Sequence, residues 1–170
     1  SENEIVNIAR QIISYEVEKT DGKVYSNIPT GMMTGLMRYF PDKSIDFKYI
    51  IDNFLNESKK LFTLSDVLSL MHYGYVSNYS TSSKHELHLN LLFPHYIITS
   101  GYILLIDLYT ESGFLCRNPV IIEKYSEIFL KKFEETTPYV KKYNDIMMLK
   151  EVNSDVFSRG IGKPTFFHSF

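Results

Sequence analysis

Two histidines near the middle of the chain have a spacing that could bind a metal ion. His85 and His88 lie three residues apart around Glu86, with His72 and His95 on either side. On a helix, this spacing could direct two imidazoles at one metal. No further ligand stands at a fixed spacing, however, and the order differs from the two-histidine motif of zinc hydrolases. We therefore expect no metal site and interpret these histidines as surface residues beside a loop.

A stretch near the end of the sequence, Ser158–Thr165, has some features of a phosphate-binding loop. That loop requires glycine six residues before its lysine and Ser or Thr directly after it. Relative to Lys163, those two positions hold Phe157 and Pro164. The alternative is a flexible tail, and we expect no phosphate site here.

The single cysteine, Cys116, could act as a nucleophile only with a histidine nearby and a route to solvent. Its neighbours Phe114 and Leu115 favour a small buried hydrophobe instead. Spacing alone identifies no pair of carboxylates in opposed environments. We therefore predict no catalytic residue, no cofactor and no enzymatic activity. One cysteine also excludes an internal disulfide and favours a reducing, intracellular compartment.

Composition limits the class of protein further. The chain has 170 residues, of which 44% are hydrophobic and 22% are charged, and its net charge is -2. This length and balance predict one folded domain with one core. No dense stripe of Lys and Arg is present, so we do not expect nucleic acid as a partner.

The elements that would position these residues are predicted to be helices. Apolar residues recur at three and four over residues 2–19, 30–40, 44–60 and 63–75, which is the period of one helix face. Residues 77–84 lack that period and are predicted to form a loop. Asn118 and Pro119 favour the start of another helix, and Pro138 opens a further short one.

The segment Leu89–Tyr109 is apolar on every helical face, so we predict a central helix that is buried on all sides. Pro94, His95 and Asp107 interrupt it, which argues against a membrane span. A pair of strands turning at Ser100-Gly101 is the alternative. Together the elements predict an all-α bundle of about seven helices around this central helix, in a domain over residues 1–150, followed by an irregular segment over 151–170.

This layout and several short strings resemble one family of proteins. The strings are Tyr25–Thr30, Ser58–Thr63 with Asp66, and Thr110–Gly113 with Cys116, Asn118, Pro119 and Val120. In these the chain resembles the poxvirus mitochondrial apoptosis inhibitors, which are divergent viral homologues of Bcl-2. The family's motif at the start of the central helix falls on Thr99–Tyr102. Gly101 matches it, whereas Tyr102 replaces the arginine that pairs with an aspartate of the ligand.

The resemblance implies a Bcl-2-like fold and a viral inhibitor of apoptosis. Such a protein binds the Bcl-2 homology 3 helix of pro-apoptotic partners (Bim-, Bak- or Bax-like) in a surface groove. By default, the methionine and aromatic side chains of residues 30–75 belong to the core, and the groove is the functional interpretation. The groove is predicted to be lined by Met33, Leu36, Met37, Phe40, Ile51, Phe54, Met71, Tyr75, Gly101, Tyr102 and Leu105.

The resemblance also implies a place in the host cell and a mode of assembly. Family members usually attach to the mitochondrial outer membrane through an apolar tail, which residues 160–170 are too short and polar to provide. The expected location is therefore the host cytoplasm, with mitochondrial attachment in a full-length protein. Some relatives form homodimers by exchanging the first helix. Two rival functions are a Bcl-2-like inhibitor of inflammatory signalling without an open groove, and a sensor domain for an apolar ligand.

Overall fold

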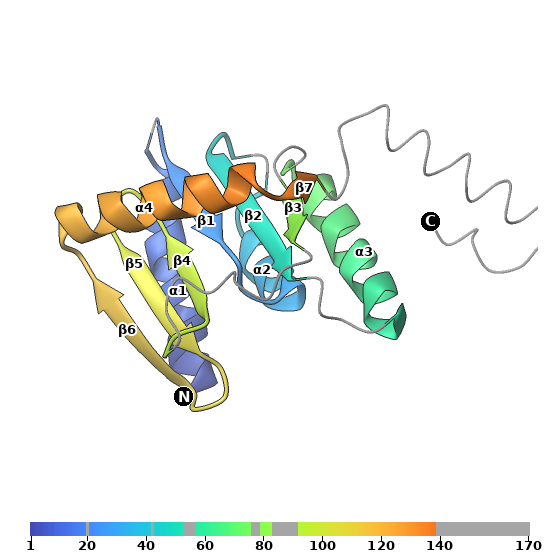
Figure 1. Cartoon of the computed structure of the whole chain (residues 1–170), viewed down its shortest axis with the longest axis horizontal. Helices are drawn as coiled ribbons and strands as arrows, with labels where there is room; N and C mark the ends of the chain where they lie inside the picture. Colours follow the sequence, from blue (N-terminus) through green and yellow to red (C-terminus); the bar gives the residue numbers. More distant parts are fainter. Residues whose placement is uncertain (20, 42, 53–56, 76–78, 83–91, 139–170) are drawn as a thin grey trace, which may run out of the picture. The chain divides into compact units, whose positions relative to one another are not determined.

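The computed structural model describes residues 1–138 except 20, 42, 53–56, 76–78 and 83–91 (Figure 1). Residues 1–139 form one compact unit, and a second unit, 140–170, lies outside the described residues together with the predicted boundary at residue 150. The described helices are α1 (Glu2–Val17), α2 (Thr30–Met37), α3 (Glu57–His72) and α4 (Pro119–Glu134). The strands are β1 (Lys23–Ser26), β2 (Asp46–Asp52), β3 (Tyr79–Ser82), β4 (His95–Ile98), β5 (Ile103–Asp107), β6 (Ser112–Cys116) and β7 (Thr137–Pro138).

All seven strands join one mixed sheet in the order β6-β5-β4-β1-β2-β3-β7. Strands β1, β2 and β3 are parallel, and α2 and α3 connect them. On the other side of β1, the antiparallel strands β4, β5 and β6 continue the sheet. Helix α4 crosses one face of this sheet, and α1 and α2 lie against the opposite face (Figure 1). The fold is therefore α/β with helices on both faces.

The face under α4 carries an aromatic and aliphatic core. Phe129 of α4 stacks on Tyr25 of β1, with 5.0 Å between ring centroids, and meets Tyr96 of β4 edge to face at 5.9 Å. Both arrangements match the preferred geometries of aromatic pairs. The buried members of this core are Tyr25, Ile50, Tyr96, Ile98, Ile103, Leu105, Ile122 and Phe129.

The predicted all-α bundle of about seven helices is wrong, and the error is largest in the predicted central helix. The segment 89–109 contains β4 and β5, which pair antiparallel from His95↔Ile106 to Ile98↔Ile103. The alternative, a strand pair turning at Ser100-Gly101, is confirmed. A strand covered on both faces is apolar at every position, and residues 103–106 are all buried. An apolar run of this kind has no hydrophobic period, so the sequence does not distinguish a buried strand from a buried helix.

The predicted helix at 44–60 and the loop at 77–84 are also wrong. Residues 46–52 form β2, and 79–82 form β3, which pairs parallel with β2. Tyr49, Ile50 and Ile51 of β2 are all buried, because α4 covers one face of the sheet and α1 and α2 the other. Burial on both faces removes the alternation that would have identified this strand.

The remaining helix predictions agree better with the structure. α1, α2 and α4 match the predicted segments, and α3 begins at Glu57, earlier than predicted. The predicted cap of α4 is confirmed, because the Asn118 side chain accepts hydrogen bonds from the backbone N–H groups of Val120 and Ile121 at 3.0 and 3.4 Å. Pro138, where a further helix was predicted to begin, lies in β7 instead, and the rest of that predicted helix lies outside the described residues.

A buried carboxylate connects α1 to the sheet. Glu16 accepts hydrogen bonds from the Lys23 backbone N–H at 2.7 Å and from the Ser100 backbone N–H at 3.1 Å and hydroxyl at 2.9 Å. Its side chain is fully buried, so these donors supply the partners that a buried carboxylate needs. The backbone of Gly22 passes close to that of Glu16, so that a Cβ at Gly22 would lie 2.4 Å from the Glu16 carbonyl oxygen. Any larger residue at position 22 would therefore force this backbone apart.

Candidate ligand pocket between α1 and the β5–β6 hairpin

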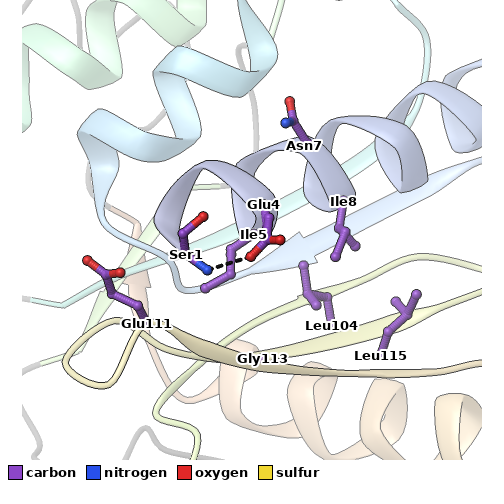
Figure 2. Close-up of a pocket in the computed structure, with 9 residues that line it drawn as sticks. All are labelled: Ser1, Glu4, Ile5, Asn7, Ile8, Leu104, Glu111, Gly113 and Leu115. Atoms are coloured by element: carbon purple, nitrogen blue, oxygen red, sulfur yellow. Dashed lines mark hydrogen bonds and ion pairs between the residues drawn. The ribbon is translucent and has the colours of Figure 1, made fainter.

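A pocket of about 370 Å³ lies between the first turns of α1 and the hairpin formed by β5 and β6 (Figure 2). Its lining comes from two segments that are distant in the sequence and meet because α1 packs against β6. The lining residues are Ser1, Glu4, Ile5, Asn7, Ile8, Leu104, Glu111, Gly113 and Leu115.

The floor of the pocket is apolar. Ile5 and Leu104 are buried, Ile8 is half-buried, and Leu115 is 41% exposed. Leu104 and Leu115 are direct cross-strand partners, so their side chains stand on the same face of the sheet, below α1. In Figure 2 both point toward Ile8 of α1. Hydrocarbon therefore forms the inner surface of the hollow.

Gly113 keeps this hollow open. A Cβ at Gly113 would lie 3.7 Å from the Leu104 Cδ1 atom and 3.8 Å from the Ile5 Cγ1 atom. A larger side chain at this position would project between α1 and the hairpin and occupy the pocket. Gly113 has this role because it lies in β6, on the face of the sheet that α1 covers.

The rim of the pocket carries two exposed carboxylates, Glu4 and Glu111. The Ser1 α-amine donates a hydrogen bond to Glu4 at 2.6 Å, drawn as the dashed line in Figure 2. Glu4 and Glu111 therefore make this rim acidic.

The two other polar side chains of the rim, Glu111 and Asn7, have different surroundings from Glu4. Glu111 forms no ion pair with another of the residues that the structure describes, and it adopts a left-handed backbone conformation with φ 52°. Asn7 accepts a hydrogen bond from the Arg10 guanidinium at 2.8 Å. Glu111 is thus the rim carboxylate that remains available to a bound cation.

The residues predicted to line a helix-binding groove lie mostly in the core. Met33, Leu36, Met37, Phe40, Ile51, Tyr75 and Leu105 are buried, and Met71 is half-buried. Leu105 belongs to the core under α4, whereas α2, with Met33, lies on the opposite face of the sheet. Gly101 and Tyr102 form the turn between β4 and β5, where the Thr99 N–H donates to the Tyr102 carbonyl at 2.8 Å. Phe54 lies outside the described residues.

Only some residues of the other predicted sites are among those that the structure describes. His85, His88 and the stretch 158–165 lie outside the described residues. Within the described ranges, no three His, Cys, Asp or Glu side chains gather in a way that could hold a metal ion. Cys116 is half-buried, packs against the core under α4, and accepts a hydrogen bond from the Asn118 N–H at 3.4 Å. Among the described helices, none has both the length and the apolar character needed to cross a bilayer.

Sequence reasoning did not identify the pocket, although it identified some of its parts. Ile5 and Ile8 belong to the predicted apolar face of the first helix. The opposite wall was missed, because β6 was not predicted and Leu104 was placed in a central helix. Pairing of β5 with β6 brings Leu104 beside Leu115, and only a correct strand prediction could have shown it.

Comparisons with known proteins give little guidance. No protein-family model and no curated protein matches the chain. Among solved structures, it is similar to TrmBL2, an archaeal chromatin protein whose structure shows a novel mode of DNA binding. The TM-score is 0.47 at 12% identity, and the match covers 78% of this chain and 50% of that chain. The chain thus spans about half the length of that protein, and a likeness this low carries no inference about function.

Proposed function

We propose that this chain is a ligand-binding domain that holds a small amphipathic amine in the pocket between α1 and the β5–β6 hairpin. The observation that carries the proposal is the pair of exposed carboxylates, Glu4 and Glu111, at the rim of an apolar hollow. A cationic head group is the kind that two carboxylates attract. Hydrocarbon on the floor suits a short apolar tail.

Size and charge both support this assignment. The pocket volume, about 370 Å³, lies at the lower end of the range of roughly 300–1,000 Å³ for small-molecule sites. An apolar floor with a few polar groups at one end is the usual composition of such sites. Two carboxylates, Glu4 and Glu111, would repel an anionic head group and attract a cationic one. The ligand class is therefore an amine with a short hydrocarbon chain.

The test is an NMR titration of methyl-labelled protein with three probes of equal chain length: hexylamine, hexanol and hexanoate. We expect the methyl resonances of Ile5, Ile8, Leu104 and Leu115 to shift. Because an exposed ion pair contributes up to about 1 kcal/mol, hexylamine should bind about fivefold more tightly than hexanol, and hexanoate most weakly. Equal binding of hexanoate, or shifts confined to other methyl groups, would contradict the proposal.

Matched variants separate the floor from the rim. Ile8→Asn should abolish binding of hexylamine and hexanol, whereas Val6→Asn, another half-buried position of α1 that does not line the pocket, should preserve both. Glu111→Gln should remove the preference for hexylamine over hexanol. Its control is Glu127→Gln, which changes an exposed carboxylate of α4.

The predicted binding of a pro-apoptotic helix rested on a helical bundle that this chain does not have. Binding of such a helix, inhibition of apoptosis and mitochondrial attachment stay predictions from the resemblance alone. Calorimetric titration against a panel of Bcl-2 homology 3 peptides tests them. The same panel with Met71→Glu, a half-buried position of α3, shows whether any binding involves the predicted groove.

A further inference from the structure

Among the described residues, nothing pairs with the outer edge of the sheet at β6, and this edge is apolar. In the sheet that these residues form, β6 is an end strand and pairs only with β5 (Figure 1). Phe114 is 56% exposed and Leu115 is 41% exposed. Native proteins usually protect such an edge with Lys, Pro, a bulge or a covering element, and the sequence Ser-Gly-Phe-Leu-Cys of β6 contains no charged residue or proline. An edge of this kind favours pairing with another strand.

Both faces of β6 are apolar at this edge. Phe114 pairs with Leu105, which belongs to the core under α4, so its side chain stands on the α4 face. Leu115 pairs with Leu104 and stands on the α1 face, where it lines the pocket. A partner that covers both side chains must therefore supply a strand in the plane of the sheet, with apolar groups on its two faces.

The residues that flank β6 identify the partner. Glu111 immediately precedes the strand and Arg117 immediately follows it. When two copies of β6 pair antiparallel over their full length, the centre falls on Phe114. Glu111 of each copy then lies opposite the partner's Arg117. Because both ends of the strand gain an opposite-charge pair, the strand is complementary to itself.

Side-chain size agrees with the same register. Gly113 lies opposite the partner's Leu115, so the position without a side chain faces the bulky one on the α1 face. On the α4 face, Phe114 lies beside the partner's Phe114. Centring the pairing on Leu115 instead would place Arg117 opposite the partner's Gly113 and remove both charge pairs. The register centred on Phe114 is therefore favoured by charge and by volume together.

We propose that two copies of this chain associate through antiparallel pairing of β6, centred on Phe114, to form one continuous sheet. Such an interface is isologous, with the same residues contributed by both copies. Neither Glu111 nor Arg117 forms an ion pair with another described residue. Arg117 lies over the Tyr102 ring, with its Cζ atom 5.2 Å from the ring centroid. The observations behind this proposal do not involve the proposed amine ligand.

The test is sedimentation velocity of the whole chain without ligand, at low salt and from micromolar to millimolar concentration. We expect a reversible monomer–dimer equilibrium that Phe114→Lys abolishes. Tyr39→Lys is the matched control, because Tyr39 is 51% exposed and lies outside β6, and it should leave the equilibrium unchanged. A wild-type chain that stays monomeric throughout, or a Phe114→Lys variant that dimerises equally well, would overturn the proposal.

Charge variants test the register. Glu111→Lys and Arg117→Glu should each weaken self-association about tenfold, since two exposed ion pairs are replaced by like charges in each dimer. In a mixture of the two variants, the introduced lysine of one chain meets the introduced glutamate of the other, and the native Arg117 meets the native Glu111. The mixture should therefore dimerise about as well as wild type. Failure of the mixture to recover while Phe114→Lys remains monomeric would place the interface at β6 but overturn this register.

A disulfide gives an independent measurement of the same register. In a Cys116→Ser background, Phe114→Cys places two cysteines directly opposite each other, about 4.5–5.5 Å apart at Cα, within the range of a disulfide. Leu115→Cys is the control, because two copies at that position are displaced along the strands by two residues from direct opposition. Mild oxidation should cross-link the first variant and not the second. The reverse result would exclude centring on Phe114.

Discussion

The hydroxyl of Tyr96 is a polar group within the apolar core under α4. The residue is fully buried beneath α4, and its oxygen has no hydrogen-bond partner among the described residues. Burial raises the pKa of this phenol, so it is neutral at neutral pH. A buried hydroxyl without a partner costs about 1–3 kcal/mol.

Tyr96→Phe removes that hydroxyl and keeps the ring that packs on Phe129. We expect the variant to gain about 1 kcal/mol in free energy of unfolding, measured by urea denaturation at neutral pH. Tyr49→Phe is the control, because the Tyr49 hydroxyl donates to the Ile28 carbonyl and its removal should destabilise the protein. A loss of stability in Tyr96→Phe would mean that the hydroxyl has a partner in solution.

Asp46 is held as an anion by two donors. Burial raises its pKa, but hydrogen bonds from Lys48 and Tyr25, together with the charges of Lys48 and Lys23, outweigh burial and leave the pKa below its ordinary value of 3.8. A lowered folded-state pKa stabilises the protein above the unfolded-state pKa, and this contribution is lost as pH falls through the folded-state pKa. Acid should therefore weaken the fold below about pH 4.

Urea midpoints between pH 7 and about pH 2.5 test this for wild type and Asp46→Asn. The variant should be less stable at neutral pH, and its stability should fall less steeply in acid, since it lacks the titrating carboxylate. If the stability of the two proteins fell in parallel with decreasing pH, Asp46 would contribute nothing to the loss of stability in acid. Tyr25 acts at the other extreme, because burial and the bond to Asp46 raise its pKa, and its contribution is lost above about pH 10.

At the scale of elements, two glycines differ in whether their surroundings leave room for a side chain. A Cβ at Gly22 would lie 2.4 Å from the Glu16 carbonyl oxygen, between α1 and β1, whereas a Cβ at Gly35 in α2 would meet nothing within 4 Å. Glycine in a helix interior is less favourable than alanine by roughly 0.5–1 kcal/mol. The same substitution should therefore have opposite signs at the two sites.

We expect Gly22→Ala to lower the melting temperature by several degrees and Gly35→Ala to raise it slightly, as measured by thermal unfolding followed by circular dichroism. The first change forces the end of α1 away from the start of β1 and strains the bonds that Glu16 makes to Lys23 and Ser100. The second stiffens the unfolded chain at no cost to packing. Stabilisation by Gly22→Ala would show that this connection can open.

The helices of this chain were more predictable than its strands. Each of α1 and α4 exposes one side, so its apolar residues recur with the helical period, and Asn118 marks the start of α4. β2 and β5 are covered on both faces and lack the alternation of a half-exposed strand. β6 is short and almost wholly exposed, so burial gave it no pattern either. Whether a segment forms a strand depends on the strands that it pairs with, and the spacing of residues within the segment does not identify those strands.

At the scale of the whole molecule, these strand errors decided the predicted function. Once residues 89–109 were assigned to a central helix, the remaining helices implied a bundle, and the bundle implied a groove. The structure buries most of the residues assigned to that groove and places an apolar pocket elsewhere, between α1 and a hairpin that was not predicted. The pocket depends on pairing of β5 with β6, a contact that no single segment encodes.

Glu111, Gly113 and Leu115 belong both to the pocket and to the proposed pairing at the edge of β6. A ligand in the pocket and a second copy at the edge would therefore contact the same three residues, and the two equilibria would be thermodynamically linked. Whatever factor the amine imposes on the monomer–dimer constant, dimerisation must impose on the affinity for the amine. The apparent affinity for the amine would then change with protein concentration, and the sign of that change would distinguish competition at Gly113 from cooperation.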